Sequence, residues 1–254
     1  ERAGFKNAIV AKRMPQPEED PDFRPEDARN SIISYKASPI GNAFGLQTSD
    51  PRTGEILGAR ISLFHCVRDL LQKWYFAQAG AVDERVHHFP FPEEVMGRLV
   101  RYLVSHEVGH TLGLRHNFYS SSTYSVEQIR DKDYVKEHGH TASIMDYARF
   151  NYVAQPEDKG VKLTPPNLGI YDEYVIKWLY TPLYGLSAKE EQAMLESWID
   201  EHAGDPIYRY GKQQVIARYD PSALEEDLGD DAIKAGDYGI KNLKYIVANM
   251  NNWF

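Results

Sequence analysis

Residues 106–116 read His-Glu-Val-Gly-His-Thr-Leu-Gly-Leu-Arg-His, and this stretch carries the strongest functional signal of the chain. His106 and His110 are four residues apart, so on a helix both imidazoles project from one face about one turn apart. That spacing lets two ring nitrogens reach one Zn²⁺ at ~2.0–2.1 Å. Glu107 is rotated away from this direction, so we expect its carboxylate to act as general base toward a metal-bound water.

The second half of the stretch predicts a third ligand. Gly113 permits the backbone to leave the helix, so the chain can turn back and present His116. Three neutral nitrogens leave a fourth coordination position open, as a catalytic zinc requires. Two other interpretations stay open: the histidines could be core residues of a buried helix, or they could hold a zinc that only stabilises the fold.

A second signal is the sequence Ser-Ile-Met-Asp-Tyr at residues 143–147. An isolated methionine is ordinarily a core residue. Downstream of the long histidine motif, however, it makes the chain resemble the metzincin metallopeptidases, whose pattern joins that motif to a methionine turn. The resemblance implies that Met145 lies beneath the three histidines as a hydrophobic floor. It also implies that Tyr147 can ligate zinc at rest and swing to the developing oxyanion; the alternative is a wall residue only.

A narrower resemblance covers most of the chain. The turn Asp-Pro-Arg-Thr-Gly-Glu at 50–55, the pair Asn117-Phe118 and residues 226–230 are similar to a family of large bacterial zinc-dependent metalloproteases. Residue 117 is Asn, unlike the residue at this place in astacins, serralysins, matrixins and adamalysins. The resemblance implies a part of a larger multidomain protein that is exported to the periplasm, the cell surface or the medium. Residues 1–5 read as a helix end stopped by a glycine, so we also expect a piece of a longer chain.

The order of the predicted elements favours an α+β fold. Residues 31–37, 43–48 and 56–64 have strand composition, and the turn at 50–54 predicts a hairpin between the last two. Helices are expected over 67–79, over 171–180 and over about 230–249. Another is expected to begin at Pro92 and end at Gly113, and a further one to begin at Ser187. Residues 17–30 are polar and proline-rich and predict a surface loop.

These elements predict a metzincin-like architecture with a twisted mixed sheet, a zinc-binding helix and a methionine turn. We expect residues 1–185 to form the catalytic domain and residues 186–254 a helical extension packed on it. The resemblance implies that strand 43–49 is the edge strand of the cleft, along which an extended peptide substrate binds.

Composition removes several other classes of protein. The 254 residues carry 29 basic and 37 acidic side chains, a net charge of −8 that argues against non-specific nucleic-acid binding. The single cysteine, Cys66, excludes an intrachain disulfide. No stretch approaches the ~18 consecutive apolar residues of a membrane span.

The sequence therefore predicts a Zn²⁺-dependent endopeptidase that acts on a protein or peptide substrate. One alternative is a binding or adhesion module that keeps the zinc fold without turnover, and another is a domain that metal only stabilises. The general base Glu107 favours catalysis over both alternatives.

Overall fold

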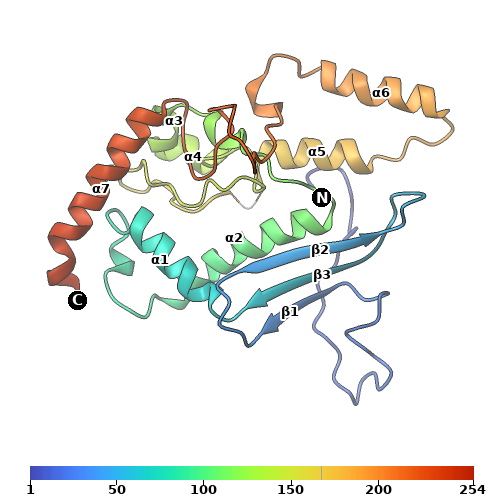
Figure 1. Cartoon of the computed structure of the whole chain (residues 1–254), viewed down its shortest axis with the longest axis horizontal. Coiled ribbons are helices and arrows are strands. Elements are labelled where there is room, and N and C mark those ends of the chain that lie inside the picture. Colours follow the sequence, from blue (N-terminus) through green and yellow to red (C-terminus); the bar gives the residue numbers. More distant parts are fainter. Residues whose placement is uncertain (167) are drawn as a thin grey trace. The chain divides into compact units, whose positions relative to one another are not determined.

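The computed structural model describes residues 1–166 and 168–254, and Figure 1 labels its elements. Three strands come first along the chain and helices follow, so the predicted α+β class is confirmed. The strands are β1 (Ile32–Lys36), β2 (Ala43–Ser49) and β3 (Ile56–Phe64). The helices are α1 (Val67–Ala79), α2 (Glu93–Thr111), α3 (Val126–Arg130), α4 (Lys132–His138), α5 (Ile170–Tyr180), α6 (Ala188–Asp200) and α7 (Ala232–Trp253), with 3-10 turns η1 (Glu84–Val86), η2 (Ser120–Ser122) and η3 (Pro206–Tyr208).

The sheet has the strand order β1-β3-β2. β1 pairs parallel to β3 and β2 pairs antiparallel to it, so the predicted mixed sheet and hairpin are both confirmed. The hairpin turn is closed by the Asp50 N–H on the Glu55 carbonyl at 2.9 Å, and Gly54 supplies the left-handed φ of 76°. β2 lies at an edge of this sheet, as expected for the strand bordering a cleft.

The chain divides into two compact units, which are described separately. The sheet unit comprises residues 7–115 and 241–254, and the second unit comprises residues 1–6 and 116–240. The boundary expected near residue 186 remains a prediction.

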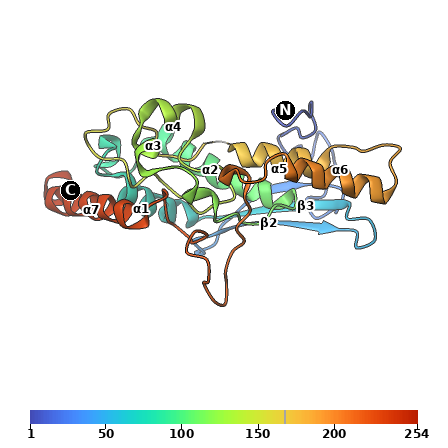
Figure 2. The ribbon, with the colours of Figure 1, turned by 90° about the horizontal axis from the view of Figure 1, so that it is seen from above.

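In the sheet unit, α2 packs on β2 and β3 (Figures 1 and 2). Its first turn follows Pro92 and carries Glu93 and Glu94, which favour the positive end of the helix dipole. Val95 and Leu99 are buried on one face of the helix. The helix ends at Thr111, and Gly113 leaves it with a φ of 89°, so the predicted start and end of this helix are confirmed.

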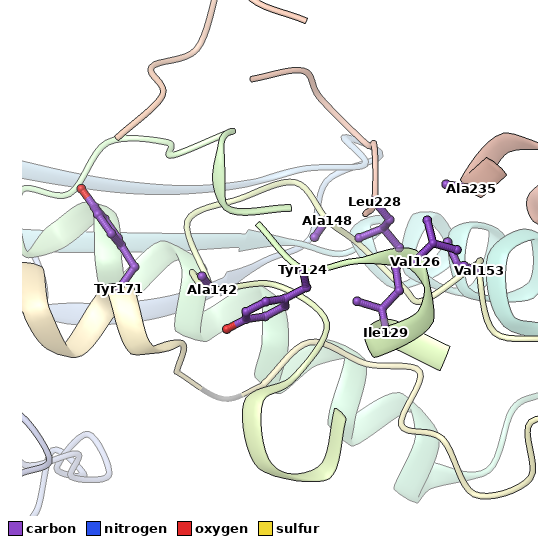
Figure 3. Packing of buried hydrophobic residues seen from close by; sticks show 9 residues of the cluster. All are labelled: Tyr124, Val126, Ile129, Ala142, Ala148, Val153, Tyr171, Leu228 and Ala235. Carbon is purple, nitrogen blue, oxygen red and sulfur yellow. The ribbon is translucent and has the colours of Figure 1, made fainter. Parts of the chain in front are cut away.

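The second unit is built around a cluster of buried apolar side chains that Figure 3 shows. Its members come from α3, α5, α7 and the loops before and between these helices: Tyr124, Val126, Ile129, Ala142, Ala148, Val153, Tyr171, Leu228 and Ala235. The sequence did not predict α3 and α4, because five and seven residues are too short to show a helical period. Both are fixed by their caps, Ser125 with a capping box and Asp131.

The predicted helices of the C-terminal region are all present. Ser187 caps α6 through a capping box with Glu190, and Trp178 on α5 donates to the Leu195 carbonyl of α6 at 3.2 Å. Residues 1–4 form one turn, with the Gly4 N–H on the Glu1 carbonyl at 2.8 Å, where a helix end was expected. Among the described residues, no helix combines the length and apolarity that crossing a membrane demands.

Candidate metal centre

Three histidines of the motif come together as the sequence predicts. α2 carries His106 and His110 one turn apart, with ring centroids 4.8 Å from each other. One nitrogen from each of these rings and one from His116 all lie within 4.8 Å of one another. Three imidazoles that converge in this way form a donor set that suits Zn²⁺.

The hydrogen bonds of two of these rings leave the correct nitrogen for a metal. Nδ1 of His110 lies 2.9 Å from the Leu114 carbonyl, and Nδ1 of His116 lies 3.0 Å from Oε1 of Gln213. Both partners are oxygen acceptors, so each Nδ1 carries the proton and each Nε2 keeps its lone pair for a cation. Burial also lowers the pKa of His110, which favours the neutral form that ligates metals. The residues present therefore fit a bound Zn²⁺.

Glu107, which follows His106 on α2, is buried, with 6% of its surface exposed. Burial raises the pKa of its carboxyl to about 7, although a hydrogen bond from the Gly45 backbone N–H acts in the opposite direction. A carboxylate with such a pKa can both accept and return a proton near neutral pH. The Gly45 bond ties this carboxylate to edge strand β2.

Gly45 is required at this point because α2 and β2 approach closely. A Cβ at Gly45 would lie 2.2 Å from the Glu107 carbonyl oxygen and 3.0 Å from its carbonyl carbon. The obstacle is backbone of a packed helix, which cannot move aside as a flexible side chain can. Sequence reasoning missed this role, because a glycine inside a strand has no distinctive pattern.

We predict that Gly45→Ala displaces β2 from α2. The forced separation should cost ~1–3 kcal/mol in the free energy of unfolding. Displacement of the Glu107 carboxylate by ~1 Å should lower kcat by up to ~10²-fold. Urea unfolding and a peptide-cleavage assay measure both effects. The matched control is Gly97→Ala on α2, where an added Cβ meets nothing within 4 Å; equal stability and kcat in the two variants would refute the prediction.

The methionine turn at 143–147 is buried and closely tied to the chain around it. Met145 is 1% exposed, and its carbonyl accepts from the Asn117 N–H at 3.1 Å. Its own N–H donates to the Ser143 hydroxyl at 3.0 Å. The turn therefore lies next to the residue that follows the third histidine. That Met145 forms a floor beneath all three histidines remains a prediction.

Asp172 in the first turn of α5 holds this turn in place, a role that the sequence did not reveal. Its carboxylate accepts from the Ser143 hydroxyl at 2.6 Å, the Ile144 N–H at 2.8 Å and the Gly169 N–H at 2.7 Å. Burial raises the pKa of Asp172 to about 6 despite these bonds. An aspartate near the start of a helix is ordinarily a capping residue. The sequence alone therefore could not assign Asp172 to the methionine turn.

Tyr147 lies beside the third histidine. Its ring centroid is 4.5 Å from that of His116 and 5.0 Å from that of Phe118. The guanidinium of Arg149 covers its ring at 4.3 Å. These contacts place the ring next to His116; the role of its hydroxyl remains a prediction.

Comparison with known proteins agrees with this geometry. A protein-family model described as Met-zincin matches residues 88–254, which is more than half of the chain. The matched region contains the histidine motif, the methionine turn and the C-terminal helices. No curated protein and no solved structure matches the chain.

Proposed function

The chain belongs to the Met-zincin family, and from this premise we propose that it is a zinc-dependent endopeptidase. The observation that carries the proposal is the convergence of His106, His110 and His116 within 4.8 Å, together with the buried carboxylate of Glu107, the residue that directly follows His106. A site that only stabilised the fold would have no use for a buried acid next to the ligand set.

The roles of the side chains follow from their positions. The three histidines would hold Zn²⁺. His110 and His116 would bind it through Nε2, because hydrogen bonds define their Nδ1 atoms as protonated. The metal, when bound, would lower the pKa of a water molecule toward ~7 and polarise the scissile carbonyl. Glu107 would accept the proton of that water and later deliver it to the leaving amine. Its bond to Gly45 keeps the carboxylate oriented for both transfers.

We propose that the substrate binds as an additional strand along β2. β2 is an edge strand, so its outer backbone groups can pair with an extended peptide. The contact between Gly45 and Glu107 brings this edge to the general base, so a peptide paired there would pass the catalytic carboxylate. Phe44 and Leu46 on β2 are exposed and available to substrate side chains.

The experiment that tests the proposal is hydrolysis of casein by the zinc-loaded chain. We expect cleavage that stops when 1,10-phenanthroline removes the metal and returns when Zn²⁺ is added back. Zinc binding without any cleavage would favour the alternative, a binding or adhesion module that retains the fold. We further propose, from the family resemblance, that the protein acts after export as part of a larger multidomain protein; detection only in the cytoplasm would contradict this.

We predict that Tyr147→Phe lowers kcat and changes KM little. The substitution removes the hydroxyl but keeps the ring against His116, so the packing at 4.5 Å is preserved. If the hydroxyl stabilises charge only in the transition state, the loss should be roughly 10²-fold. Steady-state kinetics with a fluorogenic peptide measures it, and an unchanged kcat would leave Tyr147 as a wall residue.

A further inference from the structure

A long loop far along the chain from the motif meets the third histidine. We define the clamp loop as residues 209–225, which follow η3 and precede α7 (Figure 2). Gln213 in this loop reaches His116 although 97 positions separate them in the sequence. Both residues belong to the second unit.

Asn117 fixes the start of the clamp loop beside the histidine. This residue is fully buried, its Oδ1 accepts from the Gly211 N–H at 2.8 Å, and its Nδ2 donates to the Arg209 carbonyl at 3.1 Å. The Phe118 N–H donates to the Gly211 carbonyl at 2.8 Å. The Asn117 side chain and the Phe118 backbone thus bind the same stretch, residues 209–211. This attachment fixes the position of the loop two residues before Gln213.

Gly211 makes this attachment possible. A Cβ there would lie 2.7 Å from the Cβ of Tyr119 and 2.9 Å from the Cβ of Ala223. The loop therefore passes too close to the chain for any other residue at this position. Asn117 and Gly211 together make the contact that attaches the loop beside His116. This contact explains why an asparagine directly follows the third histidine.

The orientation of the Gln213 amide is set by a second partner. Its Nε2 donates to Oε1 of Glu225 at 3.4 Å, a long bond, and Glu225 is in turn paired with Arg218 at 3.2 Å. A carboxylate accepts hydrogen bonds but cannot donate them, so the NH₂ side of the amide faces Glu225. The amide oxygen is then the side that faces Nδ1 of His116, 3.0 Å away.

The neighbouring residue keeps the clamp loop closed. Oε1 of Gln214 accepts from the N–H groups of Tyr219 and Asp220 at 2.7 and 2.9 Å. Its Nε2 donates to the carbonyls of Asp220 and Ala223, both at 2.9 Å. Gln214 thus holds the loop together through four hydrogen bonds that do not involve the contact between Gln213 and His116.

We propose that Gln213 is a positioning residue for the third zinc ligand, His116, and that the clamp loop contributes to the metal centre by holding Gln213 in place. The amide oxygen holds the proton on Nδ1 of His116, which leaves Nε2 as the nitrogen that binds the metal. Partners that orient a metal-binding histidine in this way are typically worth 10–100-fold in affinity or activity. The inference rests on the proposed zinc site, and it names a role for a segment outside the histidine motif.

The test is zinc affinity, measured by chelator competition, in Gln213→Met. Methionine keeps the approximate volume of the side chain but offers no strong acceptor. We expect a 10–100-fold weaker Kd for Zn²⁺ with little change in the unfolding of the metal-free chain. The exchange variant combines Gln213→Glu with Glu225→Gln, so that residue 213 becomes the acceptor and residue 225 the donor of the bond between them. A carboxylate oxygen of residue 213 then faces Nδ1 of His116. We expect the affinity for Zn²⁺ to return toward that of the unaltered chain.

Two control variants distinguish the orientation of His116 by Gln213 from a general effect on the stability of the clamp loop. Gln192→Met on the exposed face of α6 should leave zinc affinity unchanged. Gln214→Met should loosen the clamp loop while keeping the acceptor; an equal loss of affinity in Gln214→Met and Gln213→Met would overturn the positioning role. So would an unchanged Kd in Gln213→Met, or an exchange variant that folds without recovering affinity.

A measurement on the unaltered chain avoids any effect of substitution on folding. ¹⁵N-resolved histidine spectra of the metal-free protein should show His116 protonated on Nδ1, and protonation on Nε2 would overturn the proposal. The Co²⁺-loaded protein should show an altered absorption spectrum in Gln213→Met. If the unaltered chain binds no zinc, the proposed function fails first; if it binds zinc without proteolysis, the affinity test still decides the role of Gln213.

Discussion

Glu107→Gln should retain zinc and lose turnover, with kcat reduced by ~10²–10⁴-fold or more. The amide is nearly the same size as the carboxylate, so the helix and the three histidines keep their places. An amide oxygen can still accept from the Gly45 N–H that bonds to the carboxylate in the native chain. It cannot take a proton from water, however, so the step assigned to the general base is removed.

Zinc content and kcat must be measured on the same sample, because loss of metal would lower turnover for another reason. The matched control is Glu93→Gln, which removes an exposed carboxylate from the first turn of the same helix. We expect that control to keep full activity. Near-native kcat in Glu107→Gln with full zinc occupancy would eliminate Glu107 as the general base.

His116→Ala should weaken zinc binding by more than the 10–100-fold that loss of an orienting partner costs, because a ligand itself is removed. The effect on folding should be smaller. His116 is only half-buried and lies past the end of α2, where its ring stacks on Phe118 at 5.1 Å. Truncation removes this one ring contact at the edge of the buried Phe118, and the rest of the apolar core remains packed.

Chelator competition gives the affinity, and thermal unfolding of the metal-free chain gives the cost to the fold. His88→Ala, which removes an exposed histidine outside the motif, is the matched control and should change neither. Unchanged zinc stoichiometry and affinity in His116→Ala would show that this residue is not a ligand. The motif would then reduce to its two-histidine form, with a carboxylate elsewhere as third ligand.

The features that sequence alone could predict are those that local spacing controls. Helical periodicity and the capping residues predict α2 and α6, and the turn at 50–54 predicts the β2–β3 hairpin, all as observed. The spacing of four between His106 and His110 places both rings on one face in any helix, whatever surrounds it. Gly113 adopts the left-handed φ that lets the chain leave the helix toward His116. These properties depend on neighbours within one or two turns, so the sequence displays them directly.

The environment of each functional group was decided by tertiary contacts. Gly45 against Glu107, Asp172 against the methionine turn, and Gln213 against His116 join residues 62, 29 and 97 positions apart. A glycine, an aspartate or a glutamine has no periodic pattern that reveals which distant group it meets. Burial raises the pKa of Glu107 to about 7, and burial is a property of the packed chain and not of the residue. The ligands of the proposed metal could therefore be read from eleven consecutive residues, whereas the groups that orient them and tune the base emerged only when distant segments packed together.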